Sequence, residues 1–387
     1  MKPRAKDDTG VGSGPAVIDL FSGTGGFSLG AARAGFNVCC AVEIDAHALQ
    51  SHRVNFPNTV HLERDISLLS GKTLKSFAGI NNGDLAGIIG GPPCQGFSCI
   101  GKNSGRDTRN KLFAHFFRLV RECMPKFFLA ENVPGILHRR NNTVREAALS
   151  LVKKKYVMLP PLTMAAHDWG APTSRTRVFF FGYRRDQLDD LDEEDFAPHP
   201  NFKPVSVRDA LKGLPKKIKP HWRTEEEGWR LVNAKGTGFY SVRLQGRIPP
   251  GIGDPQALKR LRKDRRASGF LGTVHSKSVL RRYEKVVPGT RDSISKSPKL
   301  KLDGFCPTLR AGTGLDAGRY QAVRPLHPTE NRVITPREAA RLQGFPDWFQ
   351  FSETRWHSFR LIGNSVSPIL AERVLAVVNK ALGRNPS

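Results

Sequence analysis

The sequence predicts an α/β protein in which a doubly wound, mostly parallel sheet carries a smaller inserted domain. Three observations predict this class. Short, continuously apolar runs recur between Pro15 and Gly182, the segments between them have helical periodicity, and a later stretch becomes basic and rich in Gly and Pro. Apolar runs of this kind suit parallel strands that helices cover on both faces of a sheet.

The strands are expected at residues 16–21, 38–44, 85–91, 127–132 and 178–182. Between the third and fourth, Asn110 to Cys123 places Leu112, Phe113, Phe116, Leu119 and Val120 on one helical stripe. Strand–helix alternation predicts an open sheet, in which ligands bind outside the carboxyl ends of the strands. The residues that follow each strand are therefore the candidates for a functional site.

The charge of the chain is unevenly distributed. The 387 residues include 61 Lys and Arg against 35 Asp and Glu, a formal net charge of +26. Residues 203–310 hold 26 basic and 9 acidic residues, a net of +17, which leaves +9 (26 − 17) for the rest of the chain. Concentrated basic charge favours a polyanionic partner, most simply nucleic acid.

Several classes of protein are disfavoured. No apolar run approaches the roughly 18 residues that span a bilayer, so no membrane association is expected. The polar N-terminus lacks the apolar segment of a secretory signal, and the 6 cysteines contain no CxxC pair, which favours reduced thiols in the cytoplasm over a disulfide framework or a metal site.

Four segments are expected along the chain. Residues 1–14 form a flexible N-terminus, and residues 15–185 form the first part of the sheet domain. Residues 186–355 form the small inserted domain, which begins with an acidic linker, and residues 356–387 return to the sheet domain. Within the last two, Thr335 to Glu338 is a capping box that predicts a helix over 336–343, and residues 368–382 form a terminal amphipathic helix.

The first strand leads into Ser22-Gly23-Thr24-Gly25-Gly26-Phe27, whose glycines allow a tight turn and close approach to a ligand. The third glycine of a GxGxxG pattern is replaced by Ser28, and no lysine follows as in a nucleoside triphosphate site. Glu43 ends the second strand, where a carboxylate can accept hydrogen bonds from ribose hydroxyls. Asp65 could reach an adenine amino group, or simply cap a helix. Together these residues predict a nucleotide-like cofactor.

A cysteine follows the third strand in Pro92-Pro93-Cys94. The two prolines stiffen its approach, and a thiol at the carboxyl end of a strand is a candidate nucleophile. Glu131 ends the neighbouring strand and is expected near Cys94, as an acid or a hydrogen-bond donor. Arg175 and Arg177 are expected on one face at the start of the fifth strand, where they could hold a base carbonyl or a phosphate, or serve a structural role.

These motifs, PPCQGFS, ENV, DLFSGTGGFSLG and the late IGNSVSP, resemble the DNA (cytosine-5)-methyltransferases of bacterial restriction-modification systems, in the order of that family and from about Val17 to Val378. The resemblance implies a Rossmann-like methyltransferase fold and binding of S-adenosylmethionine. It implies Cys94 as the nucleophile toward cytosine C6, Glu131 at N3 and Arg175 at O2, with Arg177 beside them. The cofactor residues it implies are Phe21, Gly23, Thr24, Gly25, Glu43, Ile44, Asp65, Ile66, Pro93, Leu112, Asn364 and Val366.

The resemblance further implies that the target cytosine is flipped out of duplex DNA, that the loop with Lys102, Arg106 and Arg109 closes over it, and that the basic insert recognises the DNA sequence. The enzyme is expected to act as a monomer, with a restriction endonuclease as a genetic partner. One position departs from the family pattern, because Thr173 stands where Gln is usual. An RNA cytosine methyltransferase, a catalytically silent DNA-binding relative and, more weakly, a nicotinamide oxidoreductase are the alternatives.

Overall fold

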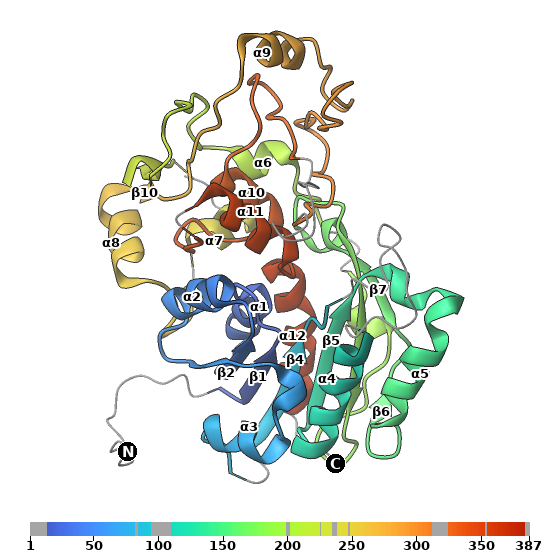
Figure 1. The fold of residues 1–387 in the computed structure, drawn as a ribbon. Helices are drawn as coiled ribbons and strands as arrows, with labels where there is room; N and C mark the ends of the chain where they lie inside the picture. Colours follow the sequence, from blue (N-terminus) through green and yellow to red (C-terminus); the bar gives the residue numbers. More distant parts are fainter. Residues whose placement is uncertain are drawn as a thin grey trace.

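The computed structural model (Figure 1) describes residues 14–81, 84–93, 110–198, 202–224, 226–233, 238–246, 248–311, 324–352 and 354–383. Cys94 lies outside the described residues, and so does the segment with Lys102, Arg106 and Arg109.

The strands of the described chain form one large mixed sheet. Its order is β3-β2-β1-β4-β5-β8-β6, with β7 also paired to β8. The first five of these strands are parallel, whereas β8 runs antiparallel to β5, β6 and β7. Their bounds are Ala16–Leu20 (β1), Asn37–Glu43 (β2), Val60–Glu63 (β3), Leu85–Gly90 (β4), Phe127–Asn132 (β5), Val157–Met158 (β6), Leu162–Ala165 (β7) and Thr176–Tyr183 (β8). The predicted doubly wound, mostly parallel sheet is confirmed. Three short strands, β3, β6 and β7, were not predicted from the apolar runs.

The order of the strands creates a switch point. From β1 the chain proceeds to β2 and β3 on one side, and then crosses to β4 on the other side of β1. Crevices that bind ligands form where the strand order reverses in this way, at the carboxyl ends of the strands. The glycine-rich turn after β1 and the Pro-Pro segment after β4 therefore lie side by side at the position where such a crevice is expected.

Helices cover both faces of the sheet (Figure 1), and alternate strand residues face two separate cores. Phe127 and Leu129 of β5 point into the core that contains α1 (Gly26–Arg33) and α12 (Pro368–Leu382). The intervening Phe128 and Ala130 join the opposite core. The helices of that second layer are α3 (Gly71–Phe77), α4 (Asn110–Cys123) and α5 (Asn142–Ser150).

The last helix, α12, packs against the first helix, α1. A Cβ built on Gly30 of α1 would lie 2.4 Å from Ala371 Cβ, so α1 and α12 approach as closely as glycine allows. Asn379 Nδ2 also donates to Ala34 O at 2.8 Å. The stretch Arg355–Leu382 is apolar and long enough to resemble a membrane span, but 72% of its apolar window is buried inside the fold. It comprises α11 (Arg355–Asn364) and α12, which serve as core helices.

The inserted region stands above the sheet, with α9 at its far end (Figure 1). It contains short elements: α6 (Val207–Leu211), β9 (Arg230–Leu231), α7 (Phe239–Gln245), α8 (Pro255–Asp264), β10 (Arg266–Ala267) and α9 (Lys277–Glu284). Helix α10 (Pro336–Gln343) follows and begins with the predicted capping box of Thr335 and Glu338. Its Arg337 and Arg341 are fully buried on backbone carbonyls and Asp347, so α10 is a scaffold rather than a phosphate contact.

Candidate active site

Glu131 is placed at the carboxyl end of β5 and is only 8% exposed. Because β8 is antiparallel to β5, the start of β8 lies beside the end of β5, and Arg177 Nε reaches Glu131 Oε1 at 2.6 Å. Both side chains are nearly buried, which strengthens their attraction relative to a solvated pair. The guanidinium therefore fixes the position of the carboxylate.

The chain that leads to Cys94 passes directly beside Glu131. Asn132 Nδ2 donates to Pro92 O at 3.3 Å, and a Cβ built on Gly91 would lie 3.4 Å from Glu131 Oε2. Position 91 is thus in van der Waals range of the carboxylate. The expected proximity of Glu131 to the segment that carries Cys94 is thus seen up to Pro93, the last described residue before the thiol.

The cysteines within the described residues are all poor nucleophiles. Cys40, Cys123 and Cys306 are buried and Cys39 is half-buried. Burial raises the pKa of the Cys39 thiol to about 11 and that of Cys123 to about 12, and it also raises the pKa values of Cys40 and Cys306. A thiol attacks as the thiolate, so these four residues behave as small apolar side chains.

The two arginines have different surroundings. Arg175 lies directly before β8, whereas Arg177 lies within it. Its Nη1 donates to Gly363 O at 2.9 Å and Leu309 O at 3.3 Å. Arg175 thereby joins β8, the inserted region and α11, whereas Arg177 is the partner of Glu131.

Thr173, the departure from the family pattern, also joins two segments. It is fully buried, and its hydroxyl donates to Cys306 O at 3.0 Å. Backbone bonds from Cys306 N to Pro172 O and from Ser174 N to Cys306 O extend the contact at 2.9 Å each. Thr173 therefore anchors the inserted region to the edge of the sheet.

The glycine-rich turn has the backbone of a ligand-binding loop. Phe21 has φ 59°, a strained value for a residue with a side chain, and such strain concentrates at functional sites. Gly23 has φ 56°, and a Cβ built there would meet no other described atom within 4 Å. A ligand can therefore approach the backbone at Gly23. Gly26 is contacted from the other side, since its Cβ would lie 2.1 Å from Ser365 Oγ and 2.3 Å from Val366 O.

Glu43 braces this turn from the end of β2. Its Oε2 accepts from Gly23 N at 2.9 Å, and its Oε1 accepts from Ile44 N at 2.8 Å and Asp45 N at 2.9 Å. Burial raises the pKa of Glu43 against these three hydrogen bonds. A carboxylate has about four lone pairs, so roughly one remains for a ribose hydroxyl.

Apolar side chains flank the same strand ends. Ile44 is 65% exposed next to Glu43, and Leu68 is 84% exposed on the 3-10 turn Ile66–Leu68. Exposed apolar groups beside a polar site offer a surface for a flat ring such as adenine. Asp65 caps that turn by accepting from Ser67 N at 2.8 Å, which lowers its pKa, while Ile66 is buried and Leu112 is half-buried on α4.

The remaining predicted cofactor residues divide into two groups. Pro93 is half-buried, Asn364 is exposed at the end of α11, and Val366 borders Gly91 and Gly26, so these three lie around the crevice. Thr24 instead turns inward, because its hydroxyl is fully buried against Ser51 Oγ. Only the backbone of Thr24 is thus available to a ligand. Among the described residues, no group of three His, Cys, Asp or Glu could hold a metal ion.

This combination of a glycine-rich turn, a Pro-Pro strand end and a buried Glu–Arg pair has known counterparts. Residues 16–380 match the family of C-5 cytosine-specific DNA methylases. The chain belongs to this family and is a DNA (cytosine-5)-methyltransferase. The match covers almost the whole chain, including both segments that build the sheet domain.

Individual relatives of this methylase agree with the assignment. Type II methyltransferase M.XorII of Xanthomonas oryzae is 37% identical over 96% of this chain and 86% of its own length. Type II methyltransferase M.DdeI of Desulfomicrobium norvegicum is 32% identical over 92% of this chain and 86% of its own length. The crystal structure of a putative DNA modification methyltransferase from an Escherichia coli prophage is 49% identical, covers 95% of this chain and 99% of its own, and superposes with a TM-score of 0.86.

A more distant structure shares the fold alone. The S. pombe Dnmt2 methyltransferase is 16% identical over 95% of this chain and 99% of its own, with a TM-score of 0.62.

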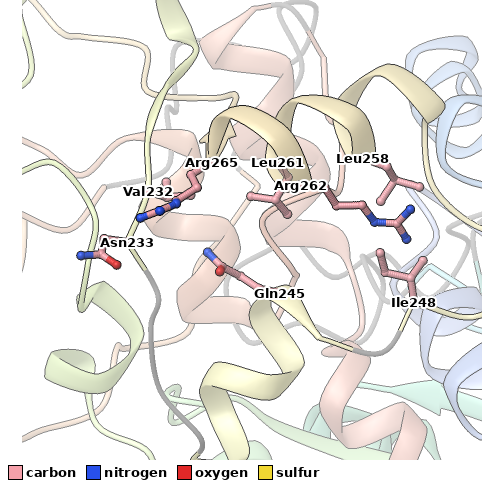
Figure 2. Close-up of a pocket in the computed structure, with 8 residues that line it drawn as sticks. All are labelled: Val232, Asn233, Gln245, Ile248, Leu258, Leu261, Arg262 and Arg265. Atoms are coloured by element: carbon pink, nitrogen blue, oxygen red, sulfur yellow. The ribbon is translucent and has the colours of Figure 1, made fainter.

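Two cavities among the described residues are lined mainly by the basic insert, and Glu131 lines neither of them. One, of about 300 Å³, is lined by residues of α7, α8 and the segment after β9. Arg265 lies near Val232 and Asn233, whereas the Arg262 side chain extends toward Ile248 and Leu258 (Figure 2). A second, of about 500 Å³, separates Lys259 and Lys263 of α8 from Pro57 and Asn58. Both cavities are lined by basic side chains together with polar and apolar ones. Most of these lining residues belong to the basic region 203–310.

Sequence reasoning missed four linked residues beneath the glycine-rich turn at residues 22–27, which is the predicted cofactor turn. Asp19, Ser28, His52 and His61 come from four different elements and form one hydrogen-bonded series. Only Ser28 carried a signal, because it replaces the third glycine of the GxGxxG pattern. Leu68 was also missed, since an isolated leucine in a short turn has no pattern of its own.

Proposed function

We propose that this methylase transfers a methyl group from S-adenosylmethionine to C5 of a flipped-out cytosine in a specific duplex DNA sequence, in the cytoplasm of a bacterium. The observation that carries the proposal is the buried Glu131–Arg177 pair beside the chain segment that leads to Cys94. The pair lies at the carboxyl end of β5, next to the Pro-Pro segment that follows β4, where a fixed carboxylate can face a ligand.

The proposed chemistry begins with Cys94. Its thiolate adds to C6 of the base, and the displaced electron pair moves toward N3, where Glu131 supplies a hydrogen bond and a proton. C5 then has enamine character and can attack an electrophilic methyl group, whose bond to its sulfonium sulfur would break as the new carbon–carbon bond forms. Removal of the C5 proton by a base, return of the N3 proton to Glu131 and departure of Cys94 from C6 as the thiolate restore the aromatic ring.

Arg177 is the guanidinium that we assign to the base edge. It already contacts Glu131 at 2.6 Å, so a base bound at that carboxylate lies within its reach. Arg175 is assigned a positioning role, because its Nη1 is committed to the carbonyls of Leu309 and Gly363. This assignment moves the expected O2 contact from Arg175 to Arg177.

The residues around the switch point fit S-adenosylmethionine, which supplies an electrophilic methyl group when bound. Gly23 leaves open space at the turn, Glu43 retains about one lone pair for a ribose hydroxyl, and Ile44 offers an exposed apolar surface. Leu68 provides a second such surface. Asn364, Val366 and Pro93 complete the proposed pocket.

The biological setting that we propose is DNA modification in a type II restriction-modification system, or by a solitary enzyme of that kind. Curated relatives carry type II names over most of this chain. The enzyme would act as a monomer, with a cognate endonuclease as a genetic partner. The net charge of +17 in residues 203–310 supports duplex DNA as the substrate rather than a compact RNA.

The proposal is tested by offering labelled S-adenosylmethionine with duplex DNA or tRNA to the full chain and to Cys94→Ser. Label is expected in DNA but not in tRNA, and the variant is expected to lose methyl transfer while it still binds DNA. Cys123→Ser is the matched control, since that thiol is buried away from the site. Normal turnover by Cys94→Ser would refute the covalent mechanism, and labelling of tRNA alone would refute the substrate. Bisulfite sequencing of DNA from expressing cells then identifies the recognition sequence.

A further inference from the structure

A series of hydrogen bonds runs beneath the cofactor turn, from the surface to a buried carboxylate. Ser28 Oγ lies 2.6 Å from Asp19 Oδ2, His52 Nε2 lies 3.0 Å from Ser28 Oγ, and His61 Nε2 lies 2.9 Å from His52 Nδ1. Asp19, Ser28 and His52 are wholly buried, whereas His61 is partly exposed on β3. None of these side chains has a role in the chemistry proposed above.

The direction of the series follows from the number of available protons. The Ser28 hydroxyl donates its single proton to Asp19, so His52 Nε2–H must donate to Ser28. His52 Nδ1 is then an acceptor, and His61 Nε2–H donates to it. In every hydrogen bond of the series, the acceptor is therefore the group nearer to Asp19, which matches an ionised Asp19 carboxylate at the end of the series. A proton on Asp19 Oδ2 would oppose the Ser28 donor and require both histidines to exchange tautomers.

The series contacts the cofactor turn directly. Gly25 has φ 99°, and a Cβ built there would lie 2.4 Å from Phe56 Cε2 and 3.0 Å from His52 Cδ2. His52 stacks on Phe56 with ring centroids 4.3 Å apart. Ser28 lies in the first turn of α1, which begins just after Gly25. A rearrangement of the His52–Ser28 contact would thus displace the backbone at Gly25.

The Asp19 end of the series is sensitive to charge. Burial raises the pKa of Asp19 to about 7, the hydrogen bond from Ser28 lowers it, and the nearby Glu43 carboxylate raises it. Burial lowers the pKa of His61 to about 4 and places that of His52 well below its ordinary value, so both histidines are neutral. Arg53 is the charged group that acts on His61, and β4 places only Ile89 opposite Asp19.

We propose that Asp19, Ser28 and His52 are positioning residues for the cofactor, and that protonation of Asp19 weakens the binding of S-adenosylmethionine. This rests on the proposed function of the crevice. The ionised carboxylate keeps the series aligned under Gly25, and its negative charge favours a ligand with a positive sulfonium. Asp19 Oδ1 has no hydrogen-bond partner within the described part of the chain, so in that part Ser28 alone stabilises the charge by hydrogen bonding. S-adenosylhomocysteine lacks the sulfonium and is expected to respond less.

The experiment is calorimetric titration of the full chain with S-adenosylmethionine and, separately, S-adenosylhomocysteine between about pH 6 and pH 8.5. Asp19 is ionised above pH 7 and protonated below it. Affinity for S-adenosylmethionine is therefore expected to fall by up to about tenfold per pH unit on the acid side, with a smaller fall for the thioether. Asp19→Asn should bind more weakly at high pH and show no such dependence.

Two further variants separate positioning from a general structural effect. Ser28→Ala removes the hydrogen bond that lowers the pKa of Asp19, so the midpoint of the binding profile should move to higher pH. His327→Gln is the matched control, a buried histidine of the inserted region near Glu338, and its profile should match the wild type.

The same pH profile in Asp19→Asn and wild type, or an unmoved midpoint in Ser28→Ala, would overturn the inference while leaving the methyltransferase proposal intact. If the wild type binds neither compound at any pH, the proposed function fails as well.

Discussion

At the scale of single residues, position in the sheet decides which polar groups meet. Glu131 and Arg177 are 46 positions apart in the sequence (177 − 131), yet the antiparallel pairing of β5 with β8 places them 2.6 Å apart. Arg175, two positions earlier, precedes the strand and is bound to carbonyls of two other segments. The sequence could identify both arginines by their motif, but their partners depend on Leu309 and Gly363, which no local pattern connects to them.

Glu131→Gln tests the role of the carboxyl directly. The amide keeps the shape of the side chain but cannot supply a proton to the base, so kcat for methyl transfer should fall by about 10² to 10⁴. Affinity for DNA should change little. Single-turnover methylation and a DNA-binding isotherm measure the two effects. Glu146→Gln, at an exposed residue paired with Lys153, should retain the wild-type rate. An unchanged rate in Glu131→Gln would exclude the carboxyl from the chemistry.

Gly25→Ala and Gly79→Ala form a matched pair at positive φ. Gly25 has φ 99° and Gly79 has φ 65°, but only at Gly25 would the new Cβ meet a ring, Phe56, at 2.4 Å. Left-handed backbone costs a residue with a side chain roughly 1–2 kcal/mol, and both variants incur this cost. Gly25→Ala should melt at the lower temperature and lose the stabilisation that S-adenosylmethionine gives. Equal melting temperatures, with and without the cofactor, would contradict this contact.

At the scale of elements, local signals predicted some boundaries well. The capping box of Thr335 and Glu338 predicted the helix over 336–343, which is α10, and the apolar stripe predicted α4 over Asn110–Cys123. Strands β6 and β7 were missed because they are short and gain their stability from pairing with β8. The antiparallel direction of β8 was likewise invisible, since strand direction is a property of tertiary contacts rather than of residue type.

Helix α10 provides a test of a buried ion pair. Arg341 donates from Nε and Nη2 to Asp347 at 2.7 Å each, and from Nη1 to Ala210 O and Lys212 O next to α6. Arg341→Leu leaves Asp347 buried without its counter-charge, so the free energy of unfolding should fall by about 3–5 kcal/mol. The double variant with Asp347→Leu should recover part of the loss. Urea unfolding followed by tryptophan fluorescence measures both.

An exposed pair supplies the control for α10. Arg184 and Asp186 lie 2.5 Å apart, with Arg184 half-buried and Asp186 exposed to solvent, so Arg184→Leu should change the free energy of unfolding by less than about 1 kcal/mol. Loss of stability in Arg184→Leu as large as in Arg341→Leu would show that burial is not the deciding factor.

At the scale of the whole molecule, the proposed catalytic residues and most of the excess positive charge lie in different parts of the methylase. The sheet domain is built from both ends of the chain, because α12 near the C-terminus packs on α1 near the N-terminus. It contains Glu131, Glu43 and the predicted cofactor turn. The inserted region contains most of the excess positive charge. Composition alone predicted this division of charge, whereas the contacts that join the two parts, such as Thr173 with Cys306, required the structure.

The charge of the insert predicts a steep salt dependence of DNA binding. Each phosphate that Lys or Arg neutralises releases a counterion, so affinity for duplex DNA should fall by orders of magnitude between about 50 and 200 mM salt. Replacing Lys216, Lys217 and Lys219 by Gln should reduce the slope of log affinity against log salt, by up to about 0.9 for each residue that contacts phosphate. Replacing Asp192, Glu193 and Asp195 of the acidic linker by their amides is the matched control, because this segment is not expected to face DNA. Fluorescence anisotropy with a labelled duplex measures all three proteins. A flat response of the wild type to salt would show that the inserted region does not bind the phosphate backbone.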